Sequence, residues 1–369
     1  MLPILFILFI VVIGIQLFYY GIIFGRFAFA KKGSNLPKKI PISVIVCAKN
    51  QEENVTKFIP LLAEQNYGDY EIILIDDASS DSTLDLFEAF EKQYTNIRLV
   101  KVANNEAFWG NRKFSLTLGI KAAKNPYLLF TDADCYPVSK DWIANMSSQF
   151  TMQKTIVLGY GAYEKIGGSF LNKIIRFENL VDTVQYFSWT KSGKPYKGIG
   201  RNFGYKKEEF FNVNGFIDHM KIRAGDDDLF INQVANSRNT TICFDPNSFT
   251  YCQPKKSFKE WMELKRINHA TTTFYKPFDK IQLLVFFISQ LLFLILPIIL
   301  LLLFQFQWIA VISLIGFRYL FAWIVLGFSA GKLKEKDVMY WFPIVEIILI
   351  FTQLNLFTSN IYSKPVYWK

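Results

Sequence analysis

Two common nucleotide-binding signatures are missing from this sequence of 369 residues. No Gly-x-Gly-x-x-Gly run follows the first predicted strand, at 42–48, and no Gly-x-x-x-x-Gly-Lys-Ser/Thr run occurs anywhere in the chain. Both signatures surround a phosphate group with backbone N–H donors at a helix start. The two commonest glycine-loop phosphate sites are therefore excluded, and any phosphate must be held in another way.

Charged residues are absent or nearly absent from two long stretches. Residues 1–23 carry no charge, and residues 281–328 carry only Arg318. Apolar runs of about 20 residues are long enough to cross a membrane as helices. We predict one N-terminal span and three C-terminal spans, the latter at 281–304, 308–330 and 338–357. A cleaved signal peptide is the alternative for the first run, but no basic segment precedes it and it is longer than usual.

The basic residues are unevenly distributed around these spans. They follow the first span and occupy the turn after the third, at Arg26, Lys31, Lys32, Lys38, Lys39, Lys332, Lys334 and Lys336. Because basic loops stay on the cytoplasmic side, we expect a bacterial-type inner (plasma) membrane protein with a cytoplasmic central domain. Much of the net charge of +10 flanks the membrane, so lipid headgroups are the expected partner and nucleic acid is not.

This pattern predicts three parts: a transmembrane anchor at 1–25, a cytoplasmic domain at 26–280 and C-terminal transmembrane helices at 281–369. The four cysteines, Cys47, Cys135, Cys243 and Cys252, all lie in the central part. Disulfides are uncommon in the cytoplasm, and no Cys-x-x-Cys spacing indicates zinc. We therefore expect all four to be reduced structural residues.

The central part alternates between apolar strands and amphipathic helices. Strands are predicted at 42–48, 70–76, 96–102 and 127–130, and helices at 53–64, 82–93 and 112–124. The strands are almost continuously apolar, as expected for a parallel sheet covered by helices on both faces. The fold class is therefore α/β, a Rossmann-like doubly wound and mostly parallel sheet, with one N-terminal and about three C-terminal transmembrane helices.

Acidic and amide side chains follow three of these strands, at Asn50, Glu52, Asp76, Asp77, Asp132 and Asp134. In doubly wound sheets, ligands bind beyond the carboxyl ends of the strands. Asp132 and Asp134 share one face of an extended backbone, and such a pair suits Mg²⁺ or Mn²⁺ shared with a diphosphate. A turn in which aspartates cap local backbone is the alternative.

A second acidic cluster, Asp226, Asp227 and Asp228, opens a predicted helix. One aspartate there would serve as the N-cap, favoured by the helix dipole. Only one residue can be the N-cap, so at least one of the other acids is available for a role in the reaction. Asp77 has a similar alternative, because Ser82 and Asp85 stand at capping-box-like spacing after it.

Five segments taken in order resemble membrane-bound glycosyltransferases of family 2, which have the GT-A fold. They are VIVCAKNQEEN, ILIDDASSDST, FTDADC, GIGRNFGY and AGDDDLF, and the resemblance covers 41–276. It implies a metal-dependent inverting glycosyltransferase of the hexosyltransferase type. The donor would be a nucleotide sugar, expected to be UDP-linked, and the acceptor a lipid-linked or membrane-proximal glycan.

The resemblance also implies roles for individual residues. The nucleotide-sugar pocket would comprise Ala48, Asn50, Glu52, Asp77, Lys113 and Asp132, with Lys113 facing the donor diphosphate. Asp134, with Asp132, would bind the divalent metal, Mg²⁺ or Mn²⁺. Gly200, Arg201 and Asn202 would lie on the acceptor side, near the transferred sugar. Asp226 and Asp227 would supply the general base, and we expect Asp227 to be the base itself.

Residue chemistry agrees with these roles. A metal ion and a cation can offset the charge that develops on a leaving diphosphate, and a carboxylate can take the proton of the attacking hydroxyl. No second nucleophilic carboxylate is required, so the expected outcome is a single displacement with inversion.

One departure from the family pattern stands after the base. Processive members carry Gln-x-x-Arg-Trp there, whereas this chain has Leu264, Ile267 and Asn268 at the matching positions. Polymer extrusion is therefore less favoured, and processivity stays open. Lys265, Arg266 or His269 could still face the diphosphate, but a basic, membrane-proximal helix face is the favoured interpretation of the first two.

Two other functions fit parts of the sequence. A nucleotidyltransferase would share the domain and the metal acids, but its glycine-rich basic loop is missing. A membrane transport or scaffold protein would use the intramembrane charges Arg318 and Glu346. We expect those two residues to form a buried ion pair between helices instead.

Overall fold

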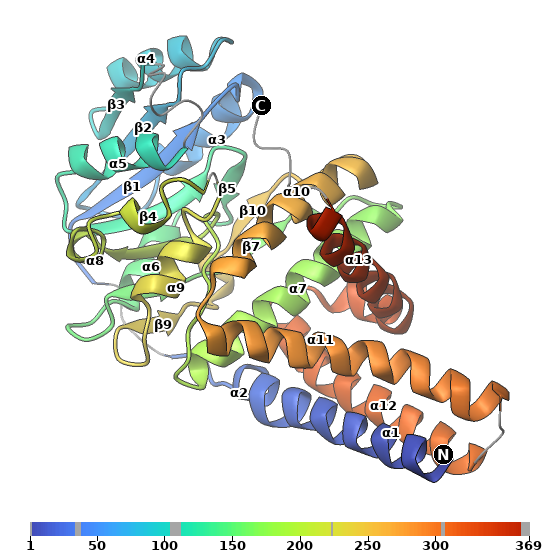
Figure 1. Cartoon of the computed structure of the whole chain (residues 1–369). Helices are drawn as coiled ribbons and strands as arrows, with labels where there is room; N and C mark the ends of the chain where they lie inside the picture. Colours follow the sequence, from blue (N-terminus) through green and yellow to red (C-terminus); the bar gives the residue numbers. More distant parts are fainter. Residues whose placement is uncertain (1, 34–37, 104–111, 223, 304–306, 363–369) are drawn as a thin grey trace. The chain divides into compact units, whose positions relative to one another are not determined.

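The computed structural model describes residues 2–33, 38–103, 112–222, 224–303 and 307–362 (Figure 1). The chain forms two compact units, which we call the helical unit (1–31, 167–192 and 257–365) and the sheet unit (32–166, 193–256 and 366–369). The expected boundaries after residues 25 and 280 divide the chain along the sequence, whereas these two units are defined by packing. Helices α7 (Phe170–Lys191) and α10 (Phe258–Thr271) belong to the helical unit, although both lie within the predicted cytoplasmic domain.

The sheet unit is built on a seven-stranded sheet with the order β3-β2-β1-β4-β8-β6-β9. Its strands are β1 (Ile42–Ala48), β2 (Tyr70–Asp76), β3 (Ile97–Lys101), β4 (Tyr127–Asp132), β6 (Ile156–Leu158), β8 (Phe203–Lys206) and β9 (Thr240–Ile242). Strands β1 to β4 are parallel, and β8 runs antiparallel to both β4 and β6. The predicted α/β class with a mostly parallel sheet is confirmed.

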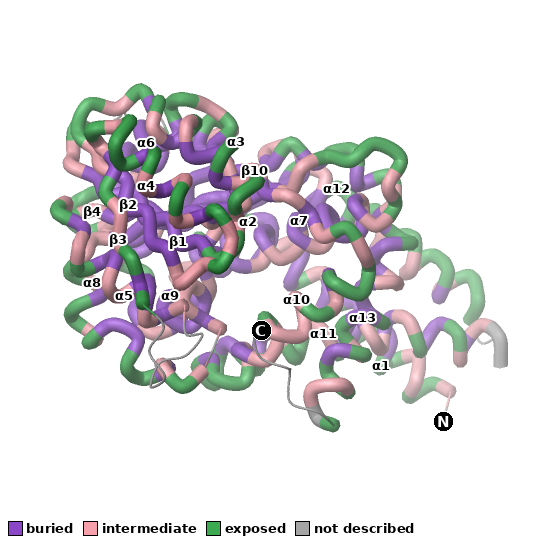
Figure 2. Tube along the Cα trace, turned by 90° about the horizontal axis from the view of Figure 1, so that it is seen from above, coloured by how far each residue is buried: buried purple, intermediate pink, exposed green. Residues whose placement is uncertain are grey.

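The first four strands and three helices lie close to the predicted positions. The helices of the sheet unit are α3 (Glu52–Ala63), α4 (Thr83–Gln93), α5 (Arg112–Ala122), α6 (Trp142–Ser148), α8 (Lys207–Asn212) and α9 (Asp228–Val234). Every residue of β1 is buried, as the continuous apolar run requires (Figure 2). Helix α5 packs closely on β2, since a Cβ at Gly119 would lie 2.1 Å from Cδ1 of Ile75.

A second, three-stranded sheet joins β5 (Cys135–Pro137), β10 (Thr250–Cys252) and β7 (Gly161–Tyr163). Cys135 and Cys252 are direct partners in the antiparallel β5–β10 pair and form a disulfide. The expectation of four reduced cysteines is therefore wrong for this pair, whereas Cys47 and Cys243 are free and buried. The two bonded cysteines are 117 residues apart, so their spacing in the sequence carries no sign of the pairing.

Within the described residues, the helical unit contains four helices that are long and apolar enough to cross a membrane: Leu2–Ala28, Pro277–Leu301, Trp308–Lys332 and Lys336–Asn360. They comprise α1 (Leu2–Leu17), η1 (Phe18–Phe24), α2 (Gly25–Ala28), α11 (Pro277–Ile298), η6 (Ile299–Leu303), α12 (Trp308–Lys332), η7 (Lys336–Trp341) and α13 (Phe342–Tyr362). These agree with the four predicted spans.

The expected pair between Arg318 and Glu346 is present inside the helical unit. The Arg318 guanidinium donates to both carboxylate oxygens of Glu346, at 2.7 and 2.5 Å. It also donates to the side chains of Gln16 and Tyr20, and the Tyr20 hydroxyl donates to Glu346. The pair therefore links α12 and α13 to the N-terminal helix, and its polar atoms are satisfied by partners within the unit.

Candidate functional site

Three parallel strands of the sheet unit end at the same level. In the strand register, Ala48 of β1 lies beside Asp76 of β2, and Cys47 lies beside Asp132 of β4. The backbone N–H of Asp77 donates to the carbonyl of Ala48 at 2.9 Å. The polar residues that follow these strands therefore gather at one edge of the sheet, where ligands of doubly wound folds bind.

The loop after β1 is tied to the loop after β2 by two exposed side chains. Oδ1 of Asn50 accepts from the backbone N–H of Ser80 at 2.8 Å, and Oε2 of Glu52 accepts from the backbone N–H of Ser82 at 3.1 Å. Asn50 has a positive φ of 53°, a conformation that asparagine tolerates better than most residues. Both predicted pocket residues thus shape the rim of the site.

Asp77 faces helix α5, where its carboxylate accepts from the hydroxyl of Ser115. The alternative in which Ser82 and Asp85 form a capping box after Asp77 is not observed, because the Ser82 side chain makes no cap hydrogen bond. Asp81 accepts from the backbone N–H of Thr83 at 3.0 Å instead. Asp77 is therefore not needed to start α4.

Arg112, the first residue of α5, contacts both acidic clusters. Its Nη2 forms an ion pair with Oδ1 of Asp132, and its Nε lies 3.3 Å from Oδ2 of Asp226. No pattern in the sequence pointed to Arg112, and the family resemblance implied the diphosphate contact for the next residue, Lys113. The sequence feature that could have indicated Arg112 is the adjacent Arg-Lys pair. Successive residues of a helix point in directions about 100° apart, so the two side chains do not face the site together.

Lys113 does not face the site. Its side chain has an exposed fraction of 0%, and its Nζ donates to the carbonyl oxygens of His219, Ile222 and Ala224, each at 2.8 Å. The family resemblance implied a contact between Lys113 and a donor diphosphate, and in the structure the Lys113 ammonium donates to three backbone carbonyls. Residues 108–111, which precede Arg112 in the family-like segment, lie outside the described residues.

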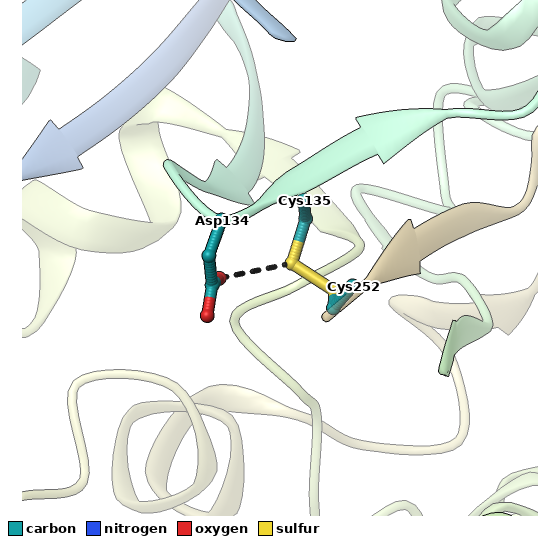
Figure 3. A group of neighbouring side chains, drawn as sticks. All are labelled: Asp134, Cys135 and Cys252. Carbon is teal, nitrogen blue, oxygen red and sulfur yellow. Dashed lines mark hydrogen bonds between the residues drawn. A yellow bond between two sulfur atoms is a disulfide. The ribbon is translucent and has the colours of Figure 1, made fainter. Parts of the chain in front are cut away.

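Asp134 lies next to the disulfide between Cys135 and Cys252, with its Oδ1 3.3 Å from Sγ of Cys135 (Figure 3). Burial, followed by the nearby charge of Asp132, raises the pKa of Asp134 above its usual value. Both sulfur atoms are occupied in the disulfide, so the carboxylate is the group of the three that suits a metal ion. A divalent cation beside Asp134 would favour the ionised form of its carboxylate.

Asp227 is the N-cap of α9. Its Oδ1 accepts from the backbone N–H of Asp228 at 2.7 Å, and its Oδ2 accepts from the backbone N–H of Gly200 at 2.6 Å. Burial, Asp228 and Asp226, in that order, raise the pKa of Asp227 to about 7. Each carboxylate oxygen has a second lone pair, so Asp227 can still accept a proton.

The three acceptor-side residues differ in what they face. Gly200 lies against Asp227, and the guanidinium of Arg201 stacks over the ring of Tyr163 at 4.2 Å. Asn202 is fully buried, and its amide bonds to the carbonyls of Tyr160 and Ser248 and to the indole N–H of Trp142. The Asn202 amide therefore joins the turn before β8 to the backbone at Tyr160 and Ser248.

A pocket lies at the same edge of the sheet. Its lining includes Arg112, Gly200 and Asp226, together with Cys47, Thr131 and Tyr205. The pocket therefore reaches Asp226 of the second acidic cluster and the end of β4.

The segment that replaces Gln-x-x-Arg-Trp lies on α10, in the helical unit. Lys265 pairs with Glu178 at 2.5 Å, and Nε of Arg266 donates to Oδ1 of Asn360 at 3.2 Å. His269 lies 3.2 Å from the Asn360 amide. These polar groups thus connect α10 to α7 and α13, and the expected basic face is occupied by contacts within the unit.

The order of these motifs matches a known protein family. A family model described as glycosyl transferase family 2 matches residues 43–228, about half of the chain. The chain belongs to glycosyl transferase family 2. As a family 2 protein it is similar to the uncharacterized glycosyltransferase EpsJ of Bacillus subtilis, with 30% identity over 56% of this chain and 64% of that protein.

Two further relatives have more specific names. The poly(ribitol-phosphate) beta-glucosyltransferase of Bacillus spizizenii is 32% identical over 32% of this chain and 18% of that protein. The dolichyl N-acetyl-alpha-D-glucosaminyl phosphate 3-beta-D-2,3-diacetamido-2,3-dideoxy-beta-D-glucuronosyltransferase of Methanococcus voltae is 28% identical over 50% of this chain and 55% of that protein. The chain therefore spans less than two thirds of each of these curated relatives.

The fold is shared with a solved structure. Mannosyltransferase PcManGT from Pyrobaculum calidifontis, in complex with GDP-Man and Mn²⁺, has a TM-score of 0.60 and 14% identity, covering 95% of this chain and 99% of that chain. At this identity the likeness shows the fold alone. The expected GT-A-like fold of this family 2 protein is therefore confirmed.

Proposed function

We propose that this family 2 protein is a metal-dependent, inverting glycosyltransferase that moves a sugar from a nucleotide sugar to a lipid-linked or membrane-proximal glycan acceptor. The observation that carries the proposal is the bridge formed by Arg112 between Asp132 and Asp226, one residue before Asp227. It brings together an acidic strand end suited to a metal, a cation suited to phosphate and a carboxylate suited to a base.

In this proposal the donor diphosphate lies near the ends of β1 and β4, with Asn50, Glu52 and Asp77 on the nucleoside side. Asp134 and Asp132 would hold Mg²⁺ or Mn²⁺, which supplies positive charge for the leaving diphosphate. PcManGT was solved with GDP-Man and Mn²⁺, which is consistent with this choice of donor and metal class. Arg112 would release part of its contact with the acids and bind phosphate oxygens, because guanidinium matches both groups.

Asp227 is proposed to accept the proton of the acceptor hydroxyl. The raised pKa of Asp227 suits a base that works near neutral pH. Asp226, in contrast, forms an ion pair with Arg112. The hydroxyl oxygen bonds to the anomeric carbon as the bond to the diphosphate oxygen breaks. A single displacement of this kind inverts the anomeric configuration.

The acceptor proposal rests on the helical unit and on two relatives. Four helices able to cross a membrane favour an acceptor at the membrane, with the sheet unit in the cytoplasm. The names of the relatives include a poly(ribitol-phosphate) acceptor and a dolichyl-linked acceptor. Family membership favours glycosyl transfer over the nucleotidyltransferase and scaffold alternatives.

The first test is a thermal-shift titration of the purified full-length protein with UDP, GDP and CDP, each with and without Mn²⁺. A ligand that binds only the folded state at 100 times its Kd stabilises it by about 2.7 kcal/mol. We expect a shift for one nucleotide, UDP, that requires the metal. A protein that shifts with none of them would contradict the donor site.

A further inference from the structure

Lys113 occupies a position that the transfer reaction does not explain. It lies in the first turn of α5, directly after Arg112, yet its ammonium is buried and donates to three backbone carbonyls at 2.8 Å. Burying an ammonium is costly unless hydrogen bonds replace its water, and an ammonium offers three N–H donors. The matched set of carbonyls indicates a built site for a lysine, not an accidental burial.

The three carbonyls belong to the segment that leads into the acidic cluster. His219 ends the short helix η3 (Ile217–His219), and Ala224 stands two residues before Asp226. Gly225, between them, has a φ of +90°, and a Cβ there would lie 2.5 Å from Cδ1 of Leu229. The path into Asp226 and Asp227 is thus constrained by the lysine on one side and by a glycine-dependent turn on the other.

We propose that Lys113 is a positioning residue that holds the backbone at His219, Ile222 and Ala224, and through it Asp226 and Asp227, in the geometry needed for transfer, without contacting the donor. The inference rests on the proposed function. It differs from the expectation drawn from the family resemblance, which placed this lysine at the donor diphosphate.

The position of Lys113 in α5 supports this role. Arg112 contacts Asp132 and Asp226, and Lys113 binds the backbone that precedes Asp226, so one helical turn fixes the acids from two sides. Burial lowers the pKa of Lys113 to about 8, while Asp226, Asp228 and Asp227 act against that shift. The side chain is therefore mainly charged at neutral pH and keeps its three donors.

Without the ammonium, the carbonyls of His219, Ile222 and Ala224 would lose a charged hydrogen-bond partner, and these residues would shift to find others. A misplacement of about 1 Å in a reacting group reduces the rate roughly 100-fold. The nucleoside side of the proposed donor site, at the ends of β1 and β2, is built from other segments and would keep its shape.

The test compares Lys113→Met with Lys207→Met. Lys207 is a matched control, since its partly buried Nζ donates at 2.6 Å to the carbonyl of Ala123, at the end of α5 away from the acids. For each variant we would measure kcat, the donor KM and the Kd for UDP with Mn²⁺. We expect kcat of Lys113→Met to fall roughly 30- to 100-fold, with the Kd changed by less than about twofold. Lys207→Met should keep a kcat close to that of the natural protein.

Two outcomes would overturn the proposal. A Lys113→Met protein with unchanged kcat would show that the segment needs no such anchor. A loss of UDP affinity in step with kcat would show that Lys113 acts on the donor directly, as the resemblance implied. If Lys113→Met does not fold, Lys113→Gln is measured in the same way.

Hydrogen–deuterium exchange separates this inference from the proposed function. In Lys113→Gln, the amides of 219–222 and 224–228 should exchange at least about tenfold faster, while those of β1 and β2 stay unchanged. Unchanged exchange of these amides would refute the anchor whatever the enzyme's activity. If the natural protein binds no nucleotide, the proposed function fails, and this comparison still decides whether Lys113 anchors the segment.

Discussion

The backbone N–H of Gly200 donates to Oδ2 of Asp227 at 2.6 Å. This bond joins the turn before β8 to the N-cap of α9, two segments that are 27 residues apart in the sequence. It places the proposed base beside the turn that the family resemblance assigns to the acceptor. A hydrogen bond from backbone also favours the ionised carboxylate, and it opposes the effect of burial on the pKa of Asp227.

Asp227→Asn should abolish most of the transfer activity and leave nucleotide binding nearly unchanged. The amide keeps an oxygen for one backbone N–H but cannot take a proton, and loss of a general base typically reduces rates about 10²- to 10⁴-fold. Turnover with a radiolabelled donor and the Kd for UDP with Mn²⁺ measure the two effects. Asp226→Asn serves as the comparison. A variant of Asp227 that kept most of its turnover would show that the base is another residue.

The rate should depend on pH through Asp227. Its folded pKa of about 7 lies well above the usual value of 3.8, because burial and two acidic neighbours disfavour the charged form. The base is therefore protonated and inactive below about pH 7, and kcat should rise with pH through that value. A pH profile of kcat measured between pH 5 and 9 tests this. A flat profile across pH 6 to 8 would argue against Asp227 as the titrating group.

Asp134→Ala should weaken nucleotide binding in the presence of metal. The carboxylate is the proposed metal ligand beside Asp132, so its removal leaves the diphosphate without part of its counter-charge. We expect the Mn²⁺-dependent thermal shift with UDP to disappear, as it should when EDTA is added to the natural protein. Glu88→Ala removes an exposed carboxylate paired with Lys101 and serves as the control. Equal shifts in both variants would place the metal elsewhere.

Arg112→Met should weaken donor binding, because the proposed phosphate contact is lost and two acids are left without their cation. One or two charged hydrogen bonds contribute about 1.5 to 3 kcal/mol each, so we expect Kd for the donor to rise by at least about tenfold. Arg98→Met is the control, since Arg98 is exposed and donates to the carbonyl of Ala122 at 2.8 Å. Isothermal titration of both variants with UDP and Mn²⁺ decides the matter, and unchanged affinity in Arg112→Met would exclude the contact.

Charge reversal should test the buried pair in the helical unit. Arg318→Glu or Glu346→Arg alone leaves like charges buried, and loss of one partner of a buried pair costs about 3 to 5 kcal/mol. The double swap restores opposite charges and should recover much of the yield and of the Tm. Purified yield and thermal melting in detergent measure the coupling between the two sites. A double variant as damaged as the single ones would show that the orientation of the pair, and not its charge balance, is required.

The pattern of apolar residues along the chain was sufficient to predict the first strands and the long apolar helices. Strands at 42–48 and 70–76 were predicted with the observed bounds, because a continuous apolar run fits only a position inside a sheet. The four apolar helices followed from length and charge for a similar reason. The acids at the strand ends were also predictable, since the carboxyl ends of parallel strands share one edge of the sheet.

Local patterns did not decide which side chain faces the site. Arg112 and Lys113 are adjacent cations, and only the packing of α5 determines that the first contacts Asp132 while the second is buried against backbone. Asn202 belongs to a family-like motif, yet its amide is enclosed by the carbonyls of Tyr160 and Ser248. These outcomes depend on the helix orientation and on strands that are distant in sequence.

The sequence by itself therefore determined the α/β class, the four apolar helices and the edge of the sheet that carries the acids, because each follows from a local pattern of burial or charge. Only the tertiary structure decided the disulfide between Cys135 and Cys252, the three-carbonyl site of Lys113 and the contact between Gly200 and Asp227. Each joins segments far apart in the chain, and their meeting depends on how the whole sheet unit packs, which no short stretch of residues encodes.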